Sequence, residues 1–185
     1  MRKTILTFVM VLFAITAFAQ NEEERSFRVP NGYQGFFEMG NCWHFDKKMP
    51  TTIQLSTTHG FFFNNSIYAG LGTGLEFNAD HVMMPFYANF RYVFLNKSAI
   101  QPFVSMRLGS YISEKMGAYG DLAVGARFSS KRDFAVSVLL VGTYYDKLDY
   151  NYYEEYQDSF GYWHDEYVES HISPSGISLR VGIEW

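Results

Sequence analysis

The sequence predicts an eight-stranded, antiparallel, up-and-down β-barrel that crosses a membrane, and three observations carry this prediction. After residue 20 the chain divides into eight segments of alternating apolar and polar residues, separated by polar or Gly/Pro-marked connections. In most of these segments one parity is apolar, while the other holds arginines and acidic residues. No stretch after residue 20 is long and apolar enough for a membrane helix, so a membrane-spanning chain would cross as strands.

The expected strands form a single meander, because they are even in number and most connections between them are short. Most are long enough for a tilted membrane strand, which needs about 9–11 residues. The eight strands are Tyr33–Phe45, Thr51–His59, Ile67–Phe77, Val82–Leu95, Ile100–Ile112, Gly117–Phe128, Phe134–Tyr145 and Ile172–Trp185.

The first four strands follow from their alternation and their boundaries. In the first, Phe36 shares a parity with Glu38, so its two faces separate less cleanly than those of the other strands. The second, Thr51–His59, is bounded by turn signals. The third sets an apolar row against three glycines and Glu76. The fourth sets an aromatic row against a face that carries Arg91.

The last four strands follow the same rule, with one exception. The fifth and sixth place Arg107, Asp121 and Arg127 on one parity and mainly aliphatic residues on the other. The seventh is ambiguous, because apolar residues occupy both parities over 136–141. The eighth ends in GISLRVGIEW, with a wholly apolar parity and a polar parity that holds two charges.

The polar parities predict a charge network inside the barrel, made of Glu38, Glu76, Arg91, Arg107, Asp121, Arg127, Arg180 and Glu184. Lysine is absent from this set, although it recurs in the turns. An enclosed polar interior favours arginine, whose planar fork can hold several carboxylates, whereas a solvated face would be rich in lysine and glutamate. The apolar parity is therefore expected to face lipid. The alternative is a secreted sandwich or lipocalin-like barrel whose charged face meets water.

Aromatic residues near the strand ends agree with a membrane location. Trp43 and Phe45 are expected at one rim of the barrel, and Phe128 and Trp185 at the other. Membrane barrels carry such aromatic girdles where lipid meets water.

The first residues predict export. Arg2 and Lys3 precede an apolar run that ends in Ala17-Phe18-Ala19, which indicates a signal peptide over residues 1–19, cleaved after Ala19. A retained membrane anchor is the alternative, but the run is shorter than the roughly 20 residues of a spanning helix. A short segment, 20–32, and a barrel domain, 33–185, would follow, located in the bacterial outer membrane.

Charge and cysteine content limit the partners and the chemistry. Without Arg2 and Lys3, 13 basic residues face 19 acidic residues, a net charge of −6, so no nucleic-acid partner is expected. Cys42 is the single cysteine; it cannot form an intramolecular disulfide and is interpreted as a small packed hydrophobe. No cofactor is expected. No metal site is predicted either, because the acidic residues lack calcium-loop spacing.

Several stretches resemble a known family. They are Ser56-Thr57-Thr58-His59-Gly60, the glycine series over Tyr68–Gly74, and the arginine-bearing strands that end at Trp185. They resemble small outer-membrane β-barrels of Bacteroides-type bacteria and, more broadly, OmpX- and OmpA-type barrels, over about residues 33–185. The resemblance implies contact with outer-membrane lipid and lipopolysaccharide. It also implies that Trp185 is the terminal aromatic signal read by the barrel-assembly machinery.

The connection of about Lys147–His171 is by far the longest, and it is expected outside the cell if both barrel termini are periplasmic. It holds seven acidic residues, with Lys147 as its only base. Long loops often carry function, and tyrosine and tryptophan favour binding. The expected contacts to an extracellular ligand or surface partner are Tyr150, Tyr152, Tyr153, Tyr156, Tyr162, Trp163 and Tyr167. A solvated hairpin whose tyrosines only extend the strands has the same composition.

The sequence offers little else for function. A barrel of eight strands is filled by its own side chains, so no open pore is expected and the interior charges are interpreted as structural. A proton or ion path through them is the functional alternative. His59 is a further candidate ligand or base, interpreted as a turn or interface residue at the periplasmic end.

A lipid A-modifying hydrolase is the competing function. His171 and Ser173 form a His-x-Ser spacing at the start of the last expected strand, with Glu169 two residues earlier. These residue types could form a nucleophile, its base and an orienting carboxylate. They resemble the His-x-Ser of lipid A deacylases in spacing alone. We therefore predict a protein that is not an enzyme and has a structural or surface-interaction role.

Overall fold

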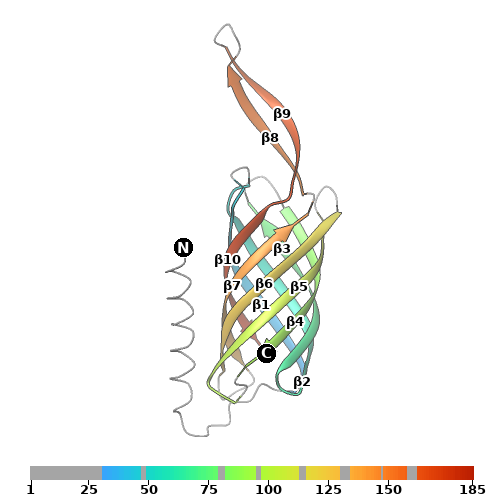
Figure 1. The fold of residues 1–185 in the computed structure, drawn as a ribbon, viewed down its shortest axis with the longest axis vertical. Coiled ribbons are helices and arrows are strands. Elements are labelled where there is room, and N and C mark those ends of the chain that lie inside the picture. The colour runs from blue at the N-terminus through green and yellow to red at the C-terminus, as the bar shows by residue number, and fades with distance from the viewer. Residues whose placement is uncertain are drawn as a thin grey trace.

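The computed structural model is a closed barrel of eight antiparallel strands with a separate two-stranded hairpin (Figure 1). It describes residues 31–46, 49–78, 82–94, 97–112, 116–129, 134–146, 148–157 and 162–185. Over residues 148–171, Tyr162 and His164 are the only described side chains. The predicted signal peptide, 1–19, and the segment 20–30 lie outside the described residues. In the described part, no helix is long and apolar enough to cross a membrane.

The barrel closes in the strand order β1-β10-β7-β6-β5-β4-β3-β2, with β1 paired to both β10 and β2. This confirms the fold class predicted from the alternation. The barrel strands are β1 (Gly32–His44), β2 (Thr52–Phe63), β3 (Ile67–Phe77), β4 (Val82–Val93), β5 (Ile100–Ile112), β6 (Met116–Ser129), β7 (Ala135–Tyr145) and β10 (Ser175–Glu184).

Two further strands, β8 (Leu148–Gln157) and β9 (Trp163–Ile172), form the hairpin. They pair only with each other and extend beyond one end of the barrel, which we call the hairpin end (Figure 1). The opposite end, which holds the turn of residues 64–66, is called the turn end. The long connection expected from the sequence is therefore a paired extension of the chain above the barrel.

Strand β2 continues to Phe63, past the predicted end at His59. Gly60 lies within β2, where the neighbouring strand β3 packs closely against it. A Cβ atom there would lie 2.2 Å from the carbonyl oxygen of Ala69. The actual turn uses Asn64 and Asn65, with φ angles of 51° and 58°. Asparagine tolerates this left-handed conformation better than most residues.

The last barrel strand begins at Ser175, three residues after the predicted start at Ile172. Ile172 instead ends β9, and Ser173 and Pro174 link the two strands. Proline has no N–H to donate to a sheet, so it interrupts pairing at this point. Its carbonyl oxygen still accepts a hydrogen bond from Tyr145 N at 3.0 Å, which ties the link to β7.

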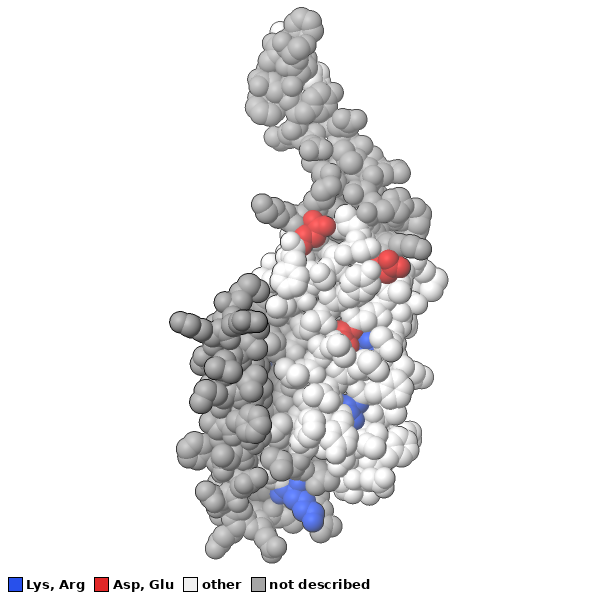
Figure 2. Space-filling view, viewed as in Figure 1, with Lys and Arg blue, Asp and Glu red and all other residues white. Residues whose placement is uncertain are grey.

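The outer wall of the barrel is apolar. Figure 2 shows that the described wall is almost entirely free of charged residues on the face in view. Leucine, valine, isoleucine, phenylalanine and methionine side chains of every barrel strand point outward and are exposed. Exposed aromatic residues lie at both rims: Trp43, Phe45 and Tyr144 at the hairpin end, and Tyr33, Phe61, Phe63, Tyr92, Phe94, Phe128, Phe134 and Trp185 at the turn end. An outer surface of this kind suits lipid rather than water.

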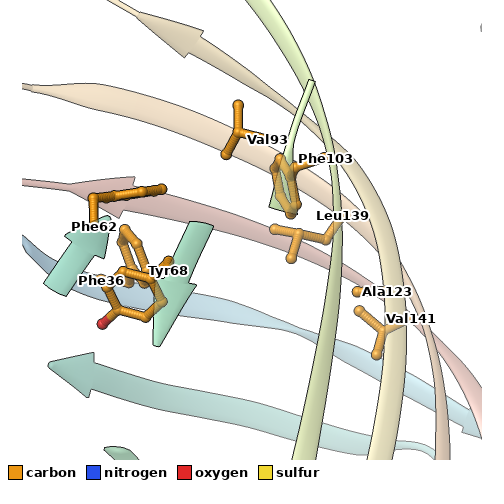
Figure 3. Close-up of a cluster of buried hydrophobic side chains, with 8 residues drawn as sticks. All are labelled: Phe36, Phe62, Tyr68, Val93, Phe103, Ala123, Leu139 and Val141. Atoms are coloured by element: carbon orange, nitrogen blue, oxygen red, sulfur yellow. The ribbon is translucent and has the colours of Figure 1, made fainter. Parts of the chain in front are cut away.

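The inner face combines polar residues with one apolar cluster. Figure 3 shows this cluster, to which Phe36, Phe62 and Tyr68 contribute closely packed rings. It also resolves the ambiguity of β7, because Leu139 and Val141 point inward and join the cluster, while Leu140 points outward. The complete cluster is Phe36, Phe62, Tyr68, Val93, Phe103, Ala123, Leu139 and Val141.

Closure of the sheet predicts resistance to SDS, because a barrel whose strands are all paired exposes no edge. The unboiled protein is expected to migrate faster than the boiled protein in SDS electrophoresis. Boiling should abolish the difference by unfolding the barrel. Equal mobility of the two samples would contradict a closed barrel.

Candidate functional site

Charged side chains cross the interior of the barrel at its middle. Arg91 on β4 donates from Nη1 to Glu184 Oε1 at 2.6 Å and from Nη2 to Glu38 Oε1 at 3.0 Å. Glu38 on β1 also accepts a hydrogen bond from Arg107 on β5 through its other oxygen. One carboxylate thus lies between two guanidinium groups that come from the opposite wall. Such charge-assisted bonds are among the strongest in proteins.

The remaining pairs extend this network to β6 and β10. Arg127 donates from Nε to Glu184 Oε2 at 2.5 Å. Arg180 donates from Nη1 to Asp121 Oδ2 at 2.8 Å, and Arg107 Nη1 lies 3.9 Å from the same oxygen. Each of the four arginines therefore contacts a carboxylate. All seven residues are at most 4% exposed. We call them the central network: Glu38, Arg91, Arg107, Asp121, Arg127, Arg180 and Glu184.

Aromatic rings cover the guanidinium faces that the carboxylates leave free. The Cζ atom of Arg91 lies 4.2 Å from the ring centres of both Phe36 and Phe103. That of Arg107 lies 4.8 Å from the ring centre of Tyr87. Stacking of this kind stabilises a buried arginine but not a lysine in the same way, which favours arginine at positions 91 and 107.

Glu76 is the eighth residue of the predicted set, and it lies in a second cluster nearer the hairpin end. Its carboxylate accepts hydrogen bonds from the hydroxyls of Thr52 and Tyr145 and from Gln54 Nε2, the last at 2.9 Å. Among the described residues, no arginine forms an ion pair with it. Gln54 connects the two clusters, because its Oε1 accepts a hydrogen bond from Arg180 Nε at 2.9 Å.

Cys42 and His44 complete this second cluster, and sequence reasoning missed both as site residues. His44 Nε2 lies 3.6 Å from Glu76 Oε1, and the Cys42 side chain is fully buried. Ligand atoms of Cys42, His44 and Glu76 all lie within 4.8 Å of one another. The sequence pattern that could have identified them is strand parity, because Cys42 and His44 lie on the same face of β1 as Glu38.

The structure does not place His171 and Ser173 at the start of the last barrel strand, so their predicted position is wrong. Ser173 lies in the link between β9 and β10, is exposed, and donates from Oγ to Asp146 Oδ1 at 3.4 Å. His171 lies in β9, paired with Asp149. The two residues therefore do not share the last barrel strand, which begins only at Ser175. The side chains of Glu169 and His171 lie outside the described residues.

The predicted contact residues of the long connection occupy the hairpin and its tip. Backbone pairing sets Tyr153 opposite Tyr167 and Gln157 opposite Trp163. Tyr162 is 70% exposed. The side chains of the other six predicted contacts, Tyr150, Tyr152, Tyr153, Tyr156, Trp163 and Tyr167, lie outside the described residues.

Trp185 extends the pairing of β1 with β10 at the turn end. Its backbone exchanges two hydrogen bonds with Gly35, at 2.9 and 3.1 Å. The indole, 45% exposed, lies so close to Gly35 that a Cβ atom there would be 2.7 Å from the ring. His59 packs edge-on against this ring from the outer wall and hydrogen-bonds the Tyr33 hydroxyl at 2.6 Å. Both residues therefore belong to the aromatic rim rather than to the interior.

Comparisons with known proteins show the fold. No protein-family model matches the chain, and no curated protein matches it. Among solved structures, neisserial surface protein A is similar with a TM-score of 0.58 at 11% identity, over 82% of this chain and 94% of that chain. The N-terminal β-barrel domain of OprF from Pseudomonas aeruginosa gives a TM-score of 0.48 at 12% identity, over 84% of this chain and 100% of that chain. A major outer membrane protein of Thermus thermophilus gives 0.44 at 10% identity, over 83% and 99%.

Proposed function

We propose that the protein is an integral β-barrel of the bacterial outer membrane that presents the β8–β9 hairpin outside the cell as a contact surface for a basic partner. The observation that carries this proposal is the hairpin itself. Its two ten-residue strands pair with each other and extend beyond the barrel wall (Figure 1). A paired extension holds a recognition surface away from the membrane at lower entropic cost than an unpaired loop of the same length.

The interior of the barrel supports a scaffold rather than a pore. Large side chains fill it, and those of the central network and of the apolar cluster are almost completely buried. A space of only about 10 Å³ remains among Gln54, Glu76, Arg107 and Arg180, about the minimum for one water molecule. Conduction through this packing would require several ion pairs to open together.

The composition of the hairpin supports a basic partner. Seven carboxylates against one lysine over residues 147–171 favour association with positive charge. Six tyrosines and a tryptophan offer broad contact area at low entropic cost. The name of the similar neisserial surface protein A is consistent with surface exposure of such a barrel.

Replacement of residues 149–171 by a short Asn-Gly turn is expected to remove binding without unfolding the barrel. Cells that produce the wild-type barrel should adhere more strongly to surfaces coated with basic proteins than to surfaces coated with acidic proteins. The variant should lose this difference and keep the heat-dependent shift in SDS electrophoresis. Screening by salt should weaken the wild-type adhesion, because exposed charges attract over only about 8 Å at physiological ionic strength.

A matched variant separates charge from aromatic contact. In it, the seven acidic residues of the hairpin become their amides and every tyrosine remains. We expect this variant to retain little of the preference for basic surfaces. Equal adhesion of wild type and hairpin-deleted cells to basic surfaces would refute the proposed role of the hairpin.

A further inference from the structure

Glu76 differs from the other buried carboxylates of the barrel in what neutralises it. Glu38, Asp121 and Glu184 each contact arginine, whereas the described partners of Glu76 are two hydroxyls, one amide and the His44 imidazole. Glu76 is 2% exposed. A buried carboxylate that contacts no arginine or lysine is expensive, so another source of positive charge at this position would stabilise it.

The imidazole of His44 lies beside Glu76, and one of its two ring nitrogens has no hydrogen-bond partner. Its side chain is completely buried, and its Nε2 faces Thr52 Oγ1 at 3.1 Å and Glu76 Oε1 at 3.6 Å. Its Nδ1 is buried without a hydrogen-bond partner. A buried polar atom left unpaired costs free energy, and native proteins rarely retain one without a reason. Imidazole nitrogen is the commonest protein ligand for transition metals.

We propose that Cys42, His44 and Glu76 form a binding site for one zinc-class divalent ion. A thiolate, an imidazole and a carboxylate are the three ligand types that zinc accepts. Calcium and magnesium take oxygen ligands only, so the sulfur and nitrogen donors select against them. A doubly charged ion would also neutralise Glu76 together with the Cys42 thiolate.

The fold positions these three residues without long loops. Cys42 and His44 are two residues apart on β1, so both point inward, and Glu76 lies on β3. Between them, Thr52 of β2 pairs with Cys42 and donates to Glu76. Ligand atoms around tetrahedral zinc are about 3.3–3.8 Å apart. The ligand atoms here lie within 4.8 Å of one another, so binding requires them to approach by about 1.5 Å at most.

The surrounding side chains already hold the carboxylate in place. Thr52, Gln54 and Tyr145 each donate to Glu76, which is how metal sites orient their ligands through the next layer of residues. His44 is the last residue of β1, so the site lies just inside the hairpin end. An ion would therefore reach it from the proposed external side of the membrane.

Cobalt titration of the full-length barrel, purified in detergent and treated with a chelator, tests the site. One equivalent of Co²⁺ should produce the near-ultraviolet thiolate-to-cobalt absorption, and Zn²⁺ should remove it by displacement. Cys42→Ser should abolish this absorption. His44→Gln should weaken Zn²⁺ affinity by about 100-fold or more, and Thr52→Val by about tenfold, since outer residues contribute about 10–100-fold.

Controls make the result specific to this cluster. His59→Gln removes the histidine of the outer rim and should leave binding unchanged. The heat-dependent shift in SDS electrophoresis verifies the fold of each variant. If the variants do not fold, the thiolate-to-cobalt absorption of the wild-type chain and its loss on addition of Zn²⁺ decide the matter, because Cys42 is the only thiol that could give this absorption. Absence of the thiolate absorption in the wild-type chain, or equal Zn²⁺ affinity of wild type and a folded His44→Gln variant, would each overturn the proposal.

Discussion

Glu38→Gln is expected to lower the free energy of unfolding by about 3–5 kcal/mol, the effect of breaking a buried ion pair by removing one partner. Glu38 is the one carboxylate in the described barrel that bonds to both Arg91 and Arg107. Without its charge, Arg91 keeps the ion pair with Glu184, and Arg107 keeps Asp121, at 3.9 Å, as its only carboxylate among the described residues. Urea unfolding in lipid vesicles, followed by tryptophan fluorescence, measures the change.

Two further variants separate the charge from the position. Met39→Leu, on the lipid side of the same strand, should change the free energy of unfolding by about 1 kcal/mol or less. The double variant Glu38→Gln with Arg107→Gln should be less destabilised than the sum of the single variants by about 1–3 kcal/mol, because it removes both members of one pair. A Glu38→Gln barrel as stable as wild type would show that the central network does not stabilise the fold.

The fold could be predicted from the sequence because the alternation of apolar and polar residues indicates both the strands and the face of each strand that points inward. In a closed barrel every strand has one face in lipid and one face inside, so the parity of a residue decides its environment. Arg91, Arg107 and Asp121 were assigned to the interior on this ground, and the structure places all of them there. Whether a residue points inward or outward follows from the alternation within its own strand, so no knowledge of long-range contacts is needed to predict it.

Which charges meet could not be predicted, because that depends on the register between strands. Glu76 shares the polar parity with the seven residues of the central network, yet its position along β3 sets it opposite Gln54 of β2 and beside the Thr52 hydroxyl. The four acidic residues and four arginines of the polar parity therefore belong to two different clusters, which the sequence pattern alone does not show. A count of charges describes the whole interior, whereas the partner of each charge depends on its depth in the barrel.

Packing inside the barrel explains the remaining differences. Gly60 lies in β2 at a point where Ala69 and Tyr68 approach too closely for a Cβ atom, and no local pattern reveals this contact. Leu139 and Val141 could be assigned to a face only once Phe103 and the other rings of the apolar cluster were in position. The sequence alone does not predict the paired hairpin, because a tyrosine-rich acidic segment fits both an ordered extension and a solvated loop.

Leu122→Arg is expected to destabilise the barrel in a bilayer by about 2–4 kcal/mol, the effect of a lipid-facing arginine at the membrane midplane. Leu122 lies at the middle of β6 and is 67% exposed on the outer wall. Met116, on the same strand and the same face, is 69% exposed but lies at the hairpin end. Met116→Arg is therefore expected to change stability by only about 0–1 kcal/mol, because its charge reaches the interface.

The comparison of these two variants tests which solvent the outer wall meets. In water, two equally exposed positions on one strand would tolerate arginine equally well, with changes within about 0.5 kcal/mol. In lipid, tolerance depends on depth, so the two variants must differ. Unfolding free energies measured in the same vesicles give this difference directly. Equal stability of the two variants would show that the outer wall meets water. The interpretations of the central network, the rims and the hairpin would then fail, because each assumes that this wall faces lipid.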